Sequence, residues 1–353
     1  MKKILLLCLF PILALAPACN KLLANTAPAS KSPVNIIFDC DMGNDMDDAM
    51  ALAILHALET RGECKLLAVT TTKGNALSAP VIDLINTFYG RSGIPIGVVK
   101  NGPTPNEGAY LRGLLELEKK DGAPAFNTTH PLDHKYPNAV TLLRETLAAA
   151  ADQSIVIVQV GFFTNLGRLL QTQPDKISPL SGRELVAKKV RLVSLMAGAF
   201  RDFESPIPDY SSSKDTSEYN VRKDIPSAAA MARDWPTEMV FCGLEVGSAI
   251  LFPPESLKKD FDYVPFHPIK EGKRFFHGLD KPQRTFDLNS ALYAVRSNAN
   301  YYQLSEPGIV TVAKDGRTLF RPDPAGKHRF MIVNARQAAA VQKVLVELTS
   351  QKP

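Results

Sequence analysis

Residues 38–52, FDCDMGNDMDDAMAL, carry five aspartates within ten positions, where an apolar strand pattern gives way to an apolar helix pattern. Carboxylates in the first turn of a helix satisfy free N–H groups and the helix dipole, so one or two need no further explanation. Five like charges in a water-poor crevice repel one another, so either their pKa values rise or a cation binds. Carboxylate oxygens favour Ca²⁺ or Mg²⁺ over zinc or copper. The spacing therefore favours a hard-cation site over capping alone.

Alternating strand and helix patterns surround this acidic turn. Six apolar runs are typical of strands buried on both faces of a parallel sheet, at residues 34–39, 64–72, 94–99, 154–160, 189–197 and 238–243. Helices with readable starts lie between them, such as those opened by Asn138 and by Asp224 with Pro226. The alternation predicts an α/β fold with an open, mostly parallel sheet flanked by helices. Because the first strand ends at Asp39 and Asp41, these acids should lie at the sheet edge where such folds bind ligands.

Two irregular stretches, residues 100–137 and 200–217, interrupt the alternation and are expected to form loops over the strand ends. Near the C-terminus, the pattern predicts a hairpin at 308–323 that turns at Asp315-Gly316. A strand at 328–333 and a helix at 335–348 should follow it.

Five short motifs follow one another along the chain. They are D-C-D-x-G with D-D-A after the first strand, T-T-x-x-G-N after the second, V-G-x-x-T-N-L at 160–166, E-Y-N at 218–220 and T-F-D-L-N-S-A-L-Y-A-V at 285–295. In this combination the sequence resembles the inosine/uridine-preferring nucleoside hydrolase family from residue 34 to about residue 300. The resemblance implies a nucleoside hydrolase-like fold with a Rossmann-like core. It also implies calcium-dependent hydrolysis of the N-glycosidic bond of purine or pyrimidine ribonucleosides, which releases base and ribose.

The resemblance assigns roles to the matching residues. Asp41 would be the general base on metal-bound water, with Asn75 near the nucleophile, and Asp39 would orient the acids. The calcium ligands would be Asp41, Asp48, Asp287 and the backbone carbonyl of Thr164. The ribose hydroxyls would be held by Asp47, Asn75, Glu218, Asn220 and Asp287.

The acidic loop departs from the family pattern in its length. Five residues, Met42 to Met46, separate Asp41 from Asp47, where the family's commonest form has three. Asp45 is therefore an additional acid, and the sequence does not give the path of the loop.

The leaving-group side of the site departs from the pattern as well. Phe286 stands where many members carry a histidine that is proposed to protonate the leaving base. A phenylalanine cannot deliver a proton, and the sequence does not separate stacking on the base from filling the core. His277 is the nearest other proton donor in the sequence, against the plainer interpretation of a packed or surface histidine. Residues 211–217 also lack the asparagine that the family often places shortly before its E-F-N motif.

The N-terminal sequence predicts export. Residues 1–18 have two lysines, an apolar run and a small-x-small ending, as a secretory signal peptide requires. Residues 19–33 would be a linker, and residues 34–350 the nucleoside hydrolase-like domain. The protein would be periplasmic or secreted. It would be tethered to the membrane only if Cys19 is lipidated, for which the preceding residues are a poor match.

The remaining alternatives concern partners and reaction class. The net charge falls from +5 to +3 without Lys2 and Lys3, which gives no support for nucleic acid as a partner beside a small-molecule nucleoside. Family members are often dimers or tetramers, so a homo-oligomer stays open. A haloacid-dehalogenase-type phosphatase also begins with D-x-D, but Gly43 stands where that class usually has Thr or Val. A non-catalytic nucleoside- or sugar-binding protein that retains the calcium site is the third interpretation.

Overall fold

The computed structural model describes residues 32–204 and 211–353. Residues Pro33–Pro353 form one compact unit. The predicted signal peptide, Cys19 and nearly all of the predicted linker lie outside the described residues, so these assignments stay predictions.

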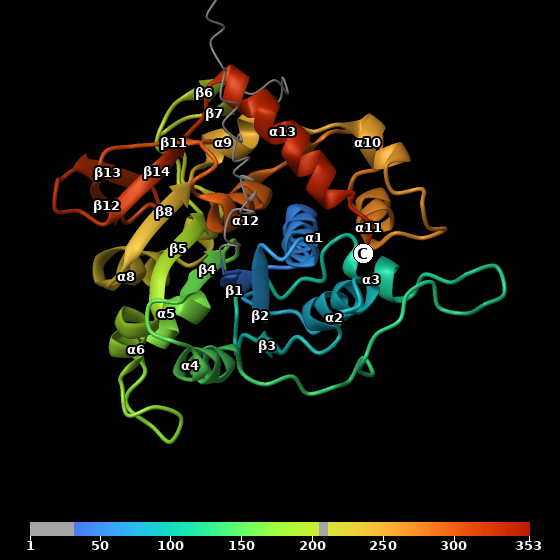
Figure 1. Ribbon diagram of the computed structural model, residues 1–353, viewed down its shortest axis with the longest axis horizontal. Helices are drawn as coiled ribbons and strands as arrows, with labels where there is room; N and C mark the ends of the chain where they lie inside the picture. Colours follow the sequence, from blue (N-terminus) through green and yellow to red (C-terminus); the bar gives the residue numbers. More distant parts are fainter. Residues whose placement is uncertain (1–31, 205–210) are drawn as a thin grey trace, which may run out of the picture. The chain divides into compact units, whose positions relative to one another are not determined.

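A sheet of ten strands crosses the fold (Figure 1). Its strands, in spatial order, are β13 (Thr318–Pro322), β12 (Gly308–Val312), β14 (His328–Ile332), β8 (Glu238–Cys242), β5 (Val190–Met196), β4 (Ile155–Gln159), β1 (Val34–Cys40), β2 (Cys64–Thr71) and β3 (Ile96–Val98), with β11 (Gln303–Leu304) beside β14. Every pairing from β14 to β3 is parallel, while β12 and β13 form an antiparallel hairpin at one edge. The predicted fold class, the six predicted strands and the C-terminal hairpin are confirmed.

Helices cover both faces of this sheet. Strand β1 shows why, because Ile36 and Phe38 enter one hydrophobic core and Ile37 enters the other, as side chains alternate along a strand. The first core lies under α1 (Asp47–Thr60), α2 (Ser78–Phe88), α12 (Phe286–Arg296) and α13 (Ala335–Thr349). The second lies under α4 (Ala139–Ala149), α5 (Thr164–Gln171), α6 (Gly182–Lys189) and α8 (Ile225–Asp234).

Shorter elements complete the described part of the chain. The helices are α3 (Leu111–Leu115), α7 (Tyr219–Lys223), α9 (Leu244–Ala249), α10 (Pro254–Lys259) and α11 (Pro268–Phe276). Two-stranded sheets pair β6 (Phe203–Glu204) with β7 (Ser211–Ser212), and β9 (Leu251–Phe252) with β10 (Gln283–Arg284). The loop expected at residues 100–137 thus contains α3, and the one expected at 200–217 contains β6 and β7.

Helix starts follow the predicted caps. The Asn138 side chain accepts hydrogen bonds from the backbone N–H groups of Val140 and Thr141 at 2.9 and 3.3 Å. The Asp224 side chain accepts from the N–H of Ser227 at 3.3 Å, with Pro226 in the first turn of α8. These caps fix where α4 and α8 begin.

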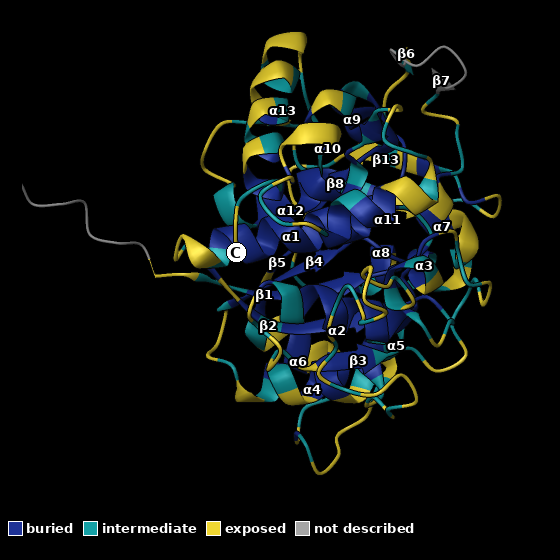
Figure 2. Cartoon of the chain, turned by 90° about the vertical axis from the view of Figure 1, so that its right-hand side faces the viewer, coloured by how far each residue is buried: buried dark blue, intermediate teal, exposed yellow. Residues whose placement is uncertain are grey.

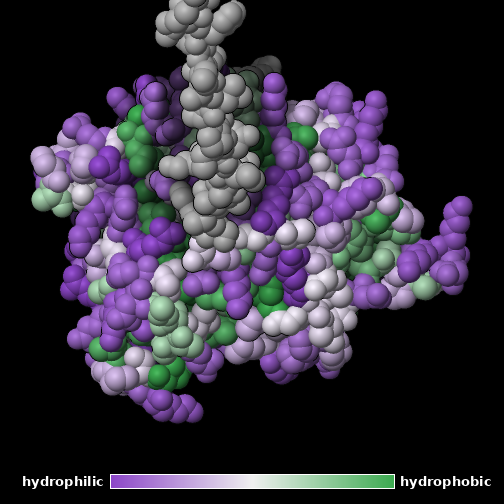
Figure 3. All heavy atoms as spheres, in the orientation of Figure 1, coloured by the Kyte–Doolittle hydropathy of each residue, from purple (hydrophilic) through white to green (hydrophobic). Residues whose placement is uncertain are grey.

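Burial differs strongly among the helices. Every residue of α1 from Asp47 to Leu58 is buried, whereas α13 and α10 keep exposed faces (Figure 2). Hydrophilic side chains dominate the surface seen in Figure 3, with hydrophobic ones in smaller patches between them. Within the part of the chain that the structure describes, none of the helices has the length and apolarity needed to cross a membrane.

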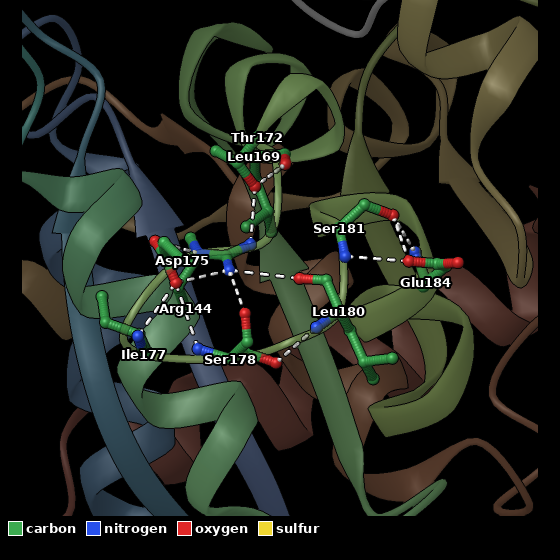
Figure 4. A network of polar contacts seen from close by, with 9 residues as sticks. All are labelled: Arg144, Leu169, Thr172, Asp175, Ile177, Ser178, Leu180, Ser181 and Glu184. Carbon is green, nitrogen blue, oxygen red and sulfur yellow. Dashed lines mark hydrogen bonds and ion pairs between the residues drawn. The ribbon is translucent and has the colours of Figure 1, made fainter.

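A buried arginine organises the connection between α5 and α6. Arg144 of α4 is 2 % exposed and forms two hydrogen bonds with the Asp175 carboxylate, at 3.0 and 2.8 Å (Figure 4). Its guanidinium also donates to the hydroxyl of Thr172 and to the carbonyls of Ser178 and Leu180. This one side chain thereby satisfies several hydrogen-bond acceptors in residues 172–180. The sequence of this segment does not by itself predict an ordered conformation.

Replacing this arginine should destabilise the fold without touching the acidic turn. We expect Arg144→Met to lower the free energy of unfolding by about 1–3 kcal/mol, because the buried carbonyls lose their donor. Urea unfolding followed by circular dichroism measures this change. Arg191→Met on β5, where the side chain is exposed, is the control and should change stability little. Equal stability of the two variants would show that the arginine does not order the connection.

Candidate functional site

The acidic turn lies at the carboxyl end of a central strand. β1 is paired on both sides, with β2 and β4, so the loop after it is flanked by the loops after its neighbours. A cavity of about 320 Å³ opens there. Its wall consists of Asp41, Asn44, Asp45, Asp47, Asp48, Val160, Met196, Glu218, Tyr219, Asn220, Leu244, Phe286 and Asp287. Seven of the ten residues predicted for the site therefore line one cavity.

Three carboxylates of this cavity are close enough to share a metal ion. Asp47, Asp48 and Asp287 each offer an oxygen, and these oxygens lie within 4.8 Å of one another. The backbone N–H of Asp287 donates to Asp47 Oδ2 at 3.3 Å, which joins the start of α12 to the start of α1. This cluster shares Asp48 and Asp287 with the ligand set implied by the family resemblance, but it contains Asp47 in place of Asp41.

Burial makes these carboxylates costly to ionise. Asp47, Asp48 and Asp287 are each at most 3 % exposed, and burial together with neighbouring carboxylates raises their pKa values well above the usual range. Burial likewise raises the pKa of Asp41 to about 6, against the hydrogen bond that Asn44 donates to it. A bound cation would remove this conflict, and an all-oxygen donor set suits a hard divalent ion.

Asp41 lies beside the cluster. Its backbone N–H donates to Asp48 Oδ1 at 2.9 Å, which ties the end of β1 to the first turn of α1. Its carboxylate is 4 % exposed and faces the cavity, where a water molecule could be deprotonated.

Asp39 is buried behind the cavity. Its Oδ1 accepts hydrogen bonds from Thr70 Oγ1 at 2.5 Å and from Asn165 Nδ2 at 2.8 Å, and burial raises its pKa to about 7. Asn165 also donates to the carbonyl of Thr71, so it joins β1, β2 and the start of α5. The sequence motif V-G-x-x-T-N-L contained this residue, but we had singled out only its neighbour Thr164.

Besides Asp39, two predicted site residues, Asn75 and Thr164, lie outside the cavity wall. Asn75 accepts from the N–H of Leu77 at 2.9 Å and donates to the carbonyl of Pro105 at 2.9 Å, so it caps the turn before α2 and holds the loop after β3. The Thr164 hydroxyl donates to the Asp224 carboxylate. Val160, the residue directly after β4, lines the cavity four positions before Thr164. The ligand role of the Thr164 backbone carbonyl and the contact of Asn75 with the ribose therefore stay predictions.

Glu218 and Asn220 also line the cavity, and hydrogen bonds hold them in its wall. The Glu218 carboxylate accepts from the N–H groups of Asn220, Val221 and Gly198 at 2.8, 3.1 and 3.2 Å, and burial raises its pKa to about 7. The Asn220 amide donates to the carbonyl of Val160 at 2.8 Å. These bonds fix both side chains in place.

The apolar part of the wall contains Phe286. This half-buried ring begins α12 and packs so closely on Gly247 that a Cβ there would lie 2.1 Å from the ring. Val160, Met196, Tyr219 and Leu244 complete an apolar surface suited to a sugar or base. His277 lies outside this wall, exposed, with its ring packed on Phe276 at 3.9 Å between centroids.

Two lysines near the cavity had no signal in the sequence. Lys73 and Lys273 are both 1 % exposed, and both bind side-chain amides next to the acidic loop. Lys73 occupies a variable position of the T-T-x-x-G-N motif and Lys273 lies outside all five motifs, so only the fold shows that both lie beside the acidic loop.

Comparisons with known proteins agree with this geometry. A family model described as inosine-uridine preferring nucleoside hydrolase matches residues 36–349. The chain is 31 % identical over 220 residues to the pyrimidine-specific ribonucleoside hydrolase RihA of Shewanella sp. (strain ANA-3), covering 60 % of this chain and 59 % of that protein. It is 27 % identical over 236 residues to the non-specific ribonucleoside hydrolase RihC of Salmonella newport (strain SL254), covering 64 % of this chain and 66 % of that one. The chain thus matches about three-fifths of the length of the first relative.

A solved structure shows the same fold. The purine-preferring ribonucleoside hydrolase from Gardnerella vaginalis aligns with a TM-score of 0.65 at 15 % identity, over 90 % of this chain and 99 % of that one. Nucleoside hydrolases of this family are metal-dependent, and the aspartate cluster agrees with that property. With a family model matched along nearly its whole described length, this chain belongs to the inosine-uridine preferring nucleoside hydrolase family.

Proposed function

We propose that this protein hydrolyses the N-glycosidic bond of ribonucleosides, releasing base and ribose, with calcium as its metal ion. One observation carries the proposal: buried carboxylates meet on the wall of a 320 Å³ cavity that also bears Glu218 and Asn220. The haloacid-dehalogenase-type phosphatase has no comparable support, because the family match covers residues 36–349.

Asp48 and Asp287 are the proposed core of the calcium site. They belong both to the family-based ligand set and to the cluster of close oxygens, and Asp47 and Asp41 are the adjacent carboxylates. A bound calcium ion would supply positive charge that lowers the pKa of a water molecule. Asp48 and Asp287 would also place negative charge near C1′, where oxocarbenium character develops as the bond to the base breaks.

Asp41 is the proposed general base, and Glu218 and Asn220 the proposed sugar ligands. Asp41 would accept the proton of the attacking water, because its carboxylate faces the cavity beside Asp48. Glu218 and Asn220, fixed by backbone hydrogen bonds, would orient the ribose so that C1′ meets that water.

The base would lie on the apolar wall around Phe286. Since Phe286 cannot donate a proton, a base that leaves readily without protonation at this position would be favoured. Relatives are named pyrimidine-specific and non-specific, so both purine and pyrimidine ribonucleosides belong in the first assays.

The carboxylate conflict predicts the behaviour of the metal-free protein. In the presence of a chelator, Asp287→Asn should stabilise the fold by about 1 kcal/mol, a Tm increase of about 2–4 °C, because one buried charge is removed. Added Ca²⁺ should then raise the Tm of the wild type more than that of the variant. Scanning calorimetry measures both effects, with exposed Asp121→Asn as the control. If Asp287→Asn melts at a lower temperature than the wild type in the presence of a chelator, the buried carboxylates do not destabilise the metal-free protein.

The reaction itself is tested by ribose release. We expect the wild type to produce reducing sugar from a panel of purine and pyrimidine ribonucleosides, and to lose activity with a chelator and regain it with Ca²⁺. Asp41→Asn should lower kcat by about 10²- to 10⁴-fold, the usual contribution of a general base, while Asp121→Asn changes nothing.

Calcium-dependent nucleoside binding without turnover over hours would instead identify a binding protein. Phosphate release from p-nitrophenyl phosphate, with no ribose from nucleosides, would identify a phosphatase.

We also propose that the protein is exported, on the signal-like order of residues 1–18. Expressed in a Gram-negative host, the mature chain should lack these residues when its mass is measured. A lipid-modified Cys19 at the new N-terminus would identify a membrane-tethered form, and an intact Met1 in the cytoplasm would contradict export.

A further inference from the structure

Two buried lysines flank the lengthened loop from Met42 to Met46 in the same way. Lys73 Nζ donates to Asn44 Oδ1 at 2.6 Å, and Lys273 Nζ donates to Gln283 Oε1 at 3.0 Å. Both lysines are almost wholly enclosed, so each ammonium group needs hydrogen-bond acceptors, and an amide oxygen is one of them in both cases.

These contacts fix which way each amide points. An ammonium group can only donate hydrogen bonds, so the amide oxygen must face the lysine and the amide NH₂ must face away. The NH₂ of Asn44 therefore faces Asp41 and donates to its Oδ2 at 2.5 Å. The NH₂ of Gln283 faces Asp45 and donates to its Oδ1 at 2.8 Å.

The two arrangements differ in the carboxylate that they reach. Lys73 acts through Asn44 on Asp41, which lies next to Asp48 and is the proposed general base. Lys273 acts through Gln283 on Asp45, the acid that the family's commonest loop lacks. The protein thus contains two similar lysine–amide pairs, and only the pair of Lys73 and Asn44 contacts the proposed general base.

Lys73 is itself held in place by the loop after β3. Its ammonium donates to the carbonyl of Thr104 at 3.1 Å, and Thr104 has a φ of 49°, which is unusual for a β-branched residue. Gly74 packs so tightly on this loop that a Cβ would lie 2.5 Å from the Gly102 carbonyl oxygen. The N–H of Gly74 donates to the carbonyl of Pro103 at 2.8 Å. The ammonium group therefore has a fixed position from which to orient Asn44.

We propose that Lys73, acting through Asn44, is a positioning residue that holds the Asp41 carboxylate in the orientation needed to serve the metal site. The amide donates to Oδ2 of a residue that lines the cavity. This role rests on the proposed calcium-dependent function.

The direction in which Ca²⁺ affinity changes when Lys73 is replaced distinguishes a positioning role from a purely electrostatic one. Removing a positive charge near a cation site should strengthen cation binding if charge alone matters. If Lys73 positions Asp41, its removal should weaken binding, because a carboxylate next to the ion becomes free to rotate. Groups that orient the ligands of a metal typically contribute about 10- to 100-fold in affinity or activity.

The experiment is a calorimetric titration of the whole protein with Ca²⁺ alone. Lys73→Met should bind Ca²⁺ at least about 10-fold more weakly than the wild type, whereas Lys273→Met should bind equally or more tightly. Each variant loses one enclosed ammonium and its contact with one amide oxygen, and Lys73→Met also loses the contact with the Thr104 carbonyl. Lys273→Met therefore controls for the loss of an enclosed charge and of an amide contact. Should Lys73→Met fail to fold, Asn44→Ala keeps Lys73 on the Thr104 carbonyl and should show the same weakening.

Turnover gives a second measurement. In an active wild type, Lys73→Met should lower kcat by about 10- to 100-fold with KM within about threefold, because the base and not the sugar is misplaced. A wild type that binds Ca²⁺ but releases no ribose would end the proposed hydrolase function, and the titration would still decide the role of Lys73. Unchanged or tighter Ca²⁺ binding by Lys73→Met, an equal loss in Lys273→Met, or no Ca²⁺ binding by the wild type would each overturn the inference.

Discussion

Repulsion among buried carboxylates at the carboxyl end of β1 is the constraint on which the rest of the structure depends. Asp39, Asp41, Asp47, Asp48, Asp287 and Glu218 are all buried around one point of the fold, and no apolar packing compensates for their ionisation. Part of this negative charge is stabilised by hydrogen bonds from backbone N–H groups and from the amides of Asn44 and Asn165, and by the nearby charges of two lysines. What they leave is a shortage of positive charge, which a divalent ion matches in size and sign. The surrounding architecture can be understood as the means of holding these groups together in spite of their repulsion.

The sheet supplies that means. Strand β1 lies between two parallel neighbours, so the main chain that carries the acids is hydrogen-bonded on both sides up to the cavity. α1 leaves the acidic loop fully buried, and α12 brings Asp287 from far along the chain to the same place. The contact from the Asp287 N–H to Asp47 shows how the two helix starts are joined directly. Rigidity at this point limits how far the carboxylates can separate when no cation is bound.

Periodicity was enough to predict the sheet, because strands buried on both faces have nearly continuous apolar sequences. The acidic motif and its distant partners were equally readable, since residues as specialised as Asp41, Asp48 and Asp287 occur in fixed order. For Thr164 the motif gives the residue type, and the structure adds that its hydroxyl contacts Asp224, while the ligand role of its backbone carbonyl stays a prediction. Lys73, Lys273 and Asn165 were missed for another reason: Lys73 and Asn165 lie inside quoted motifs and Lys273 outside them, but the partners of all three become known only from the three-dimensional structure.

The contacts of the loop from Met42 to Met46 limit how this part of the sequence can change during evolution. The longer loop carries Asn44, which contacts Lys73, and the additional Asp45, which contacts Gln283 and through it Lys273. A lineage that lost these two residues would remove the amide partner of Lys73 and the carboxylate partner of Gln283. The loop length, Lys73, Lys273 and Gln283 should therefore be inherited or lost together, as a single unit of change.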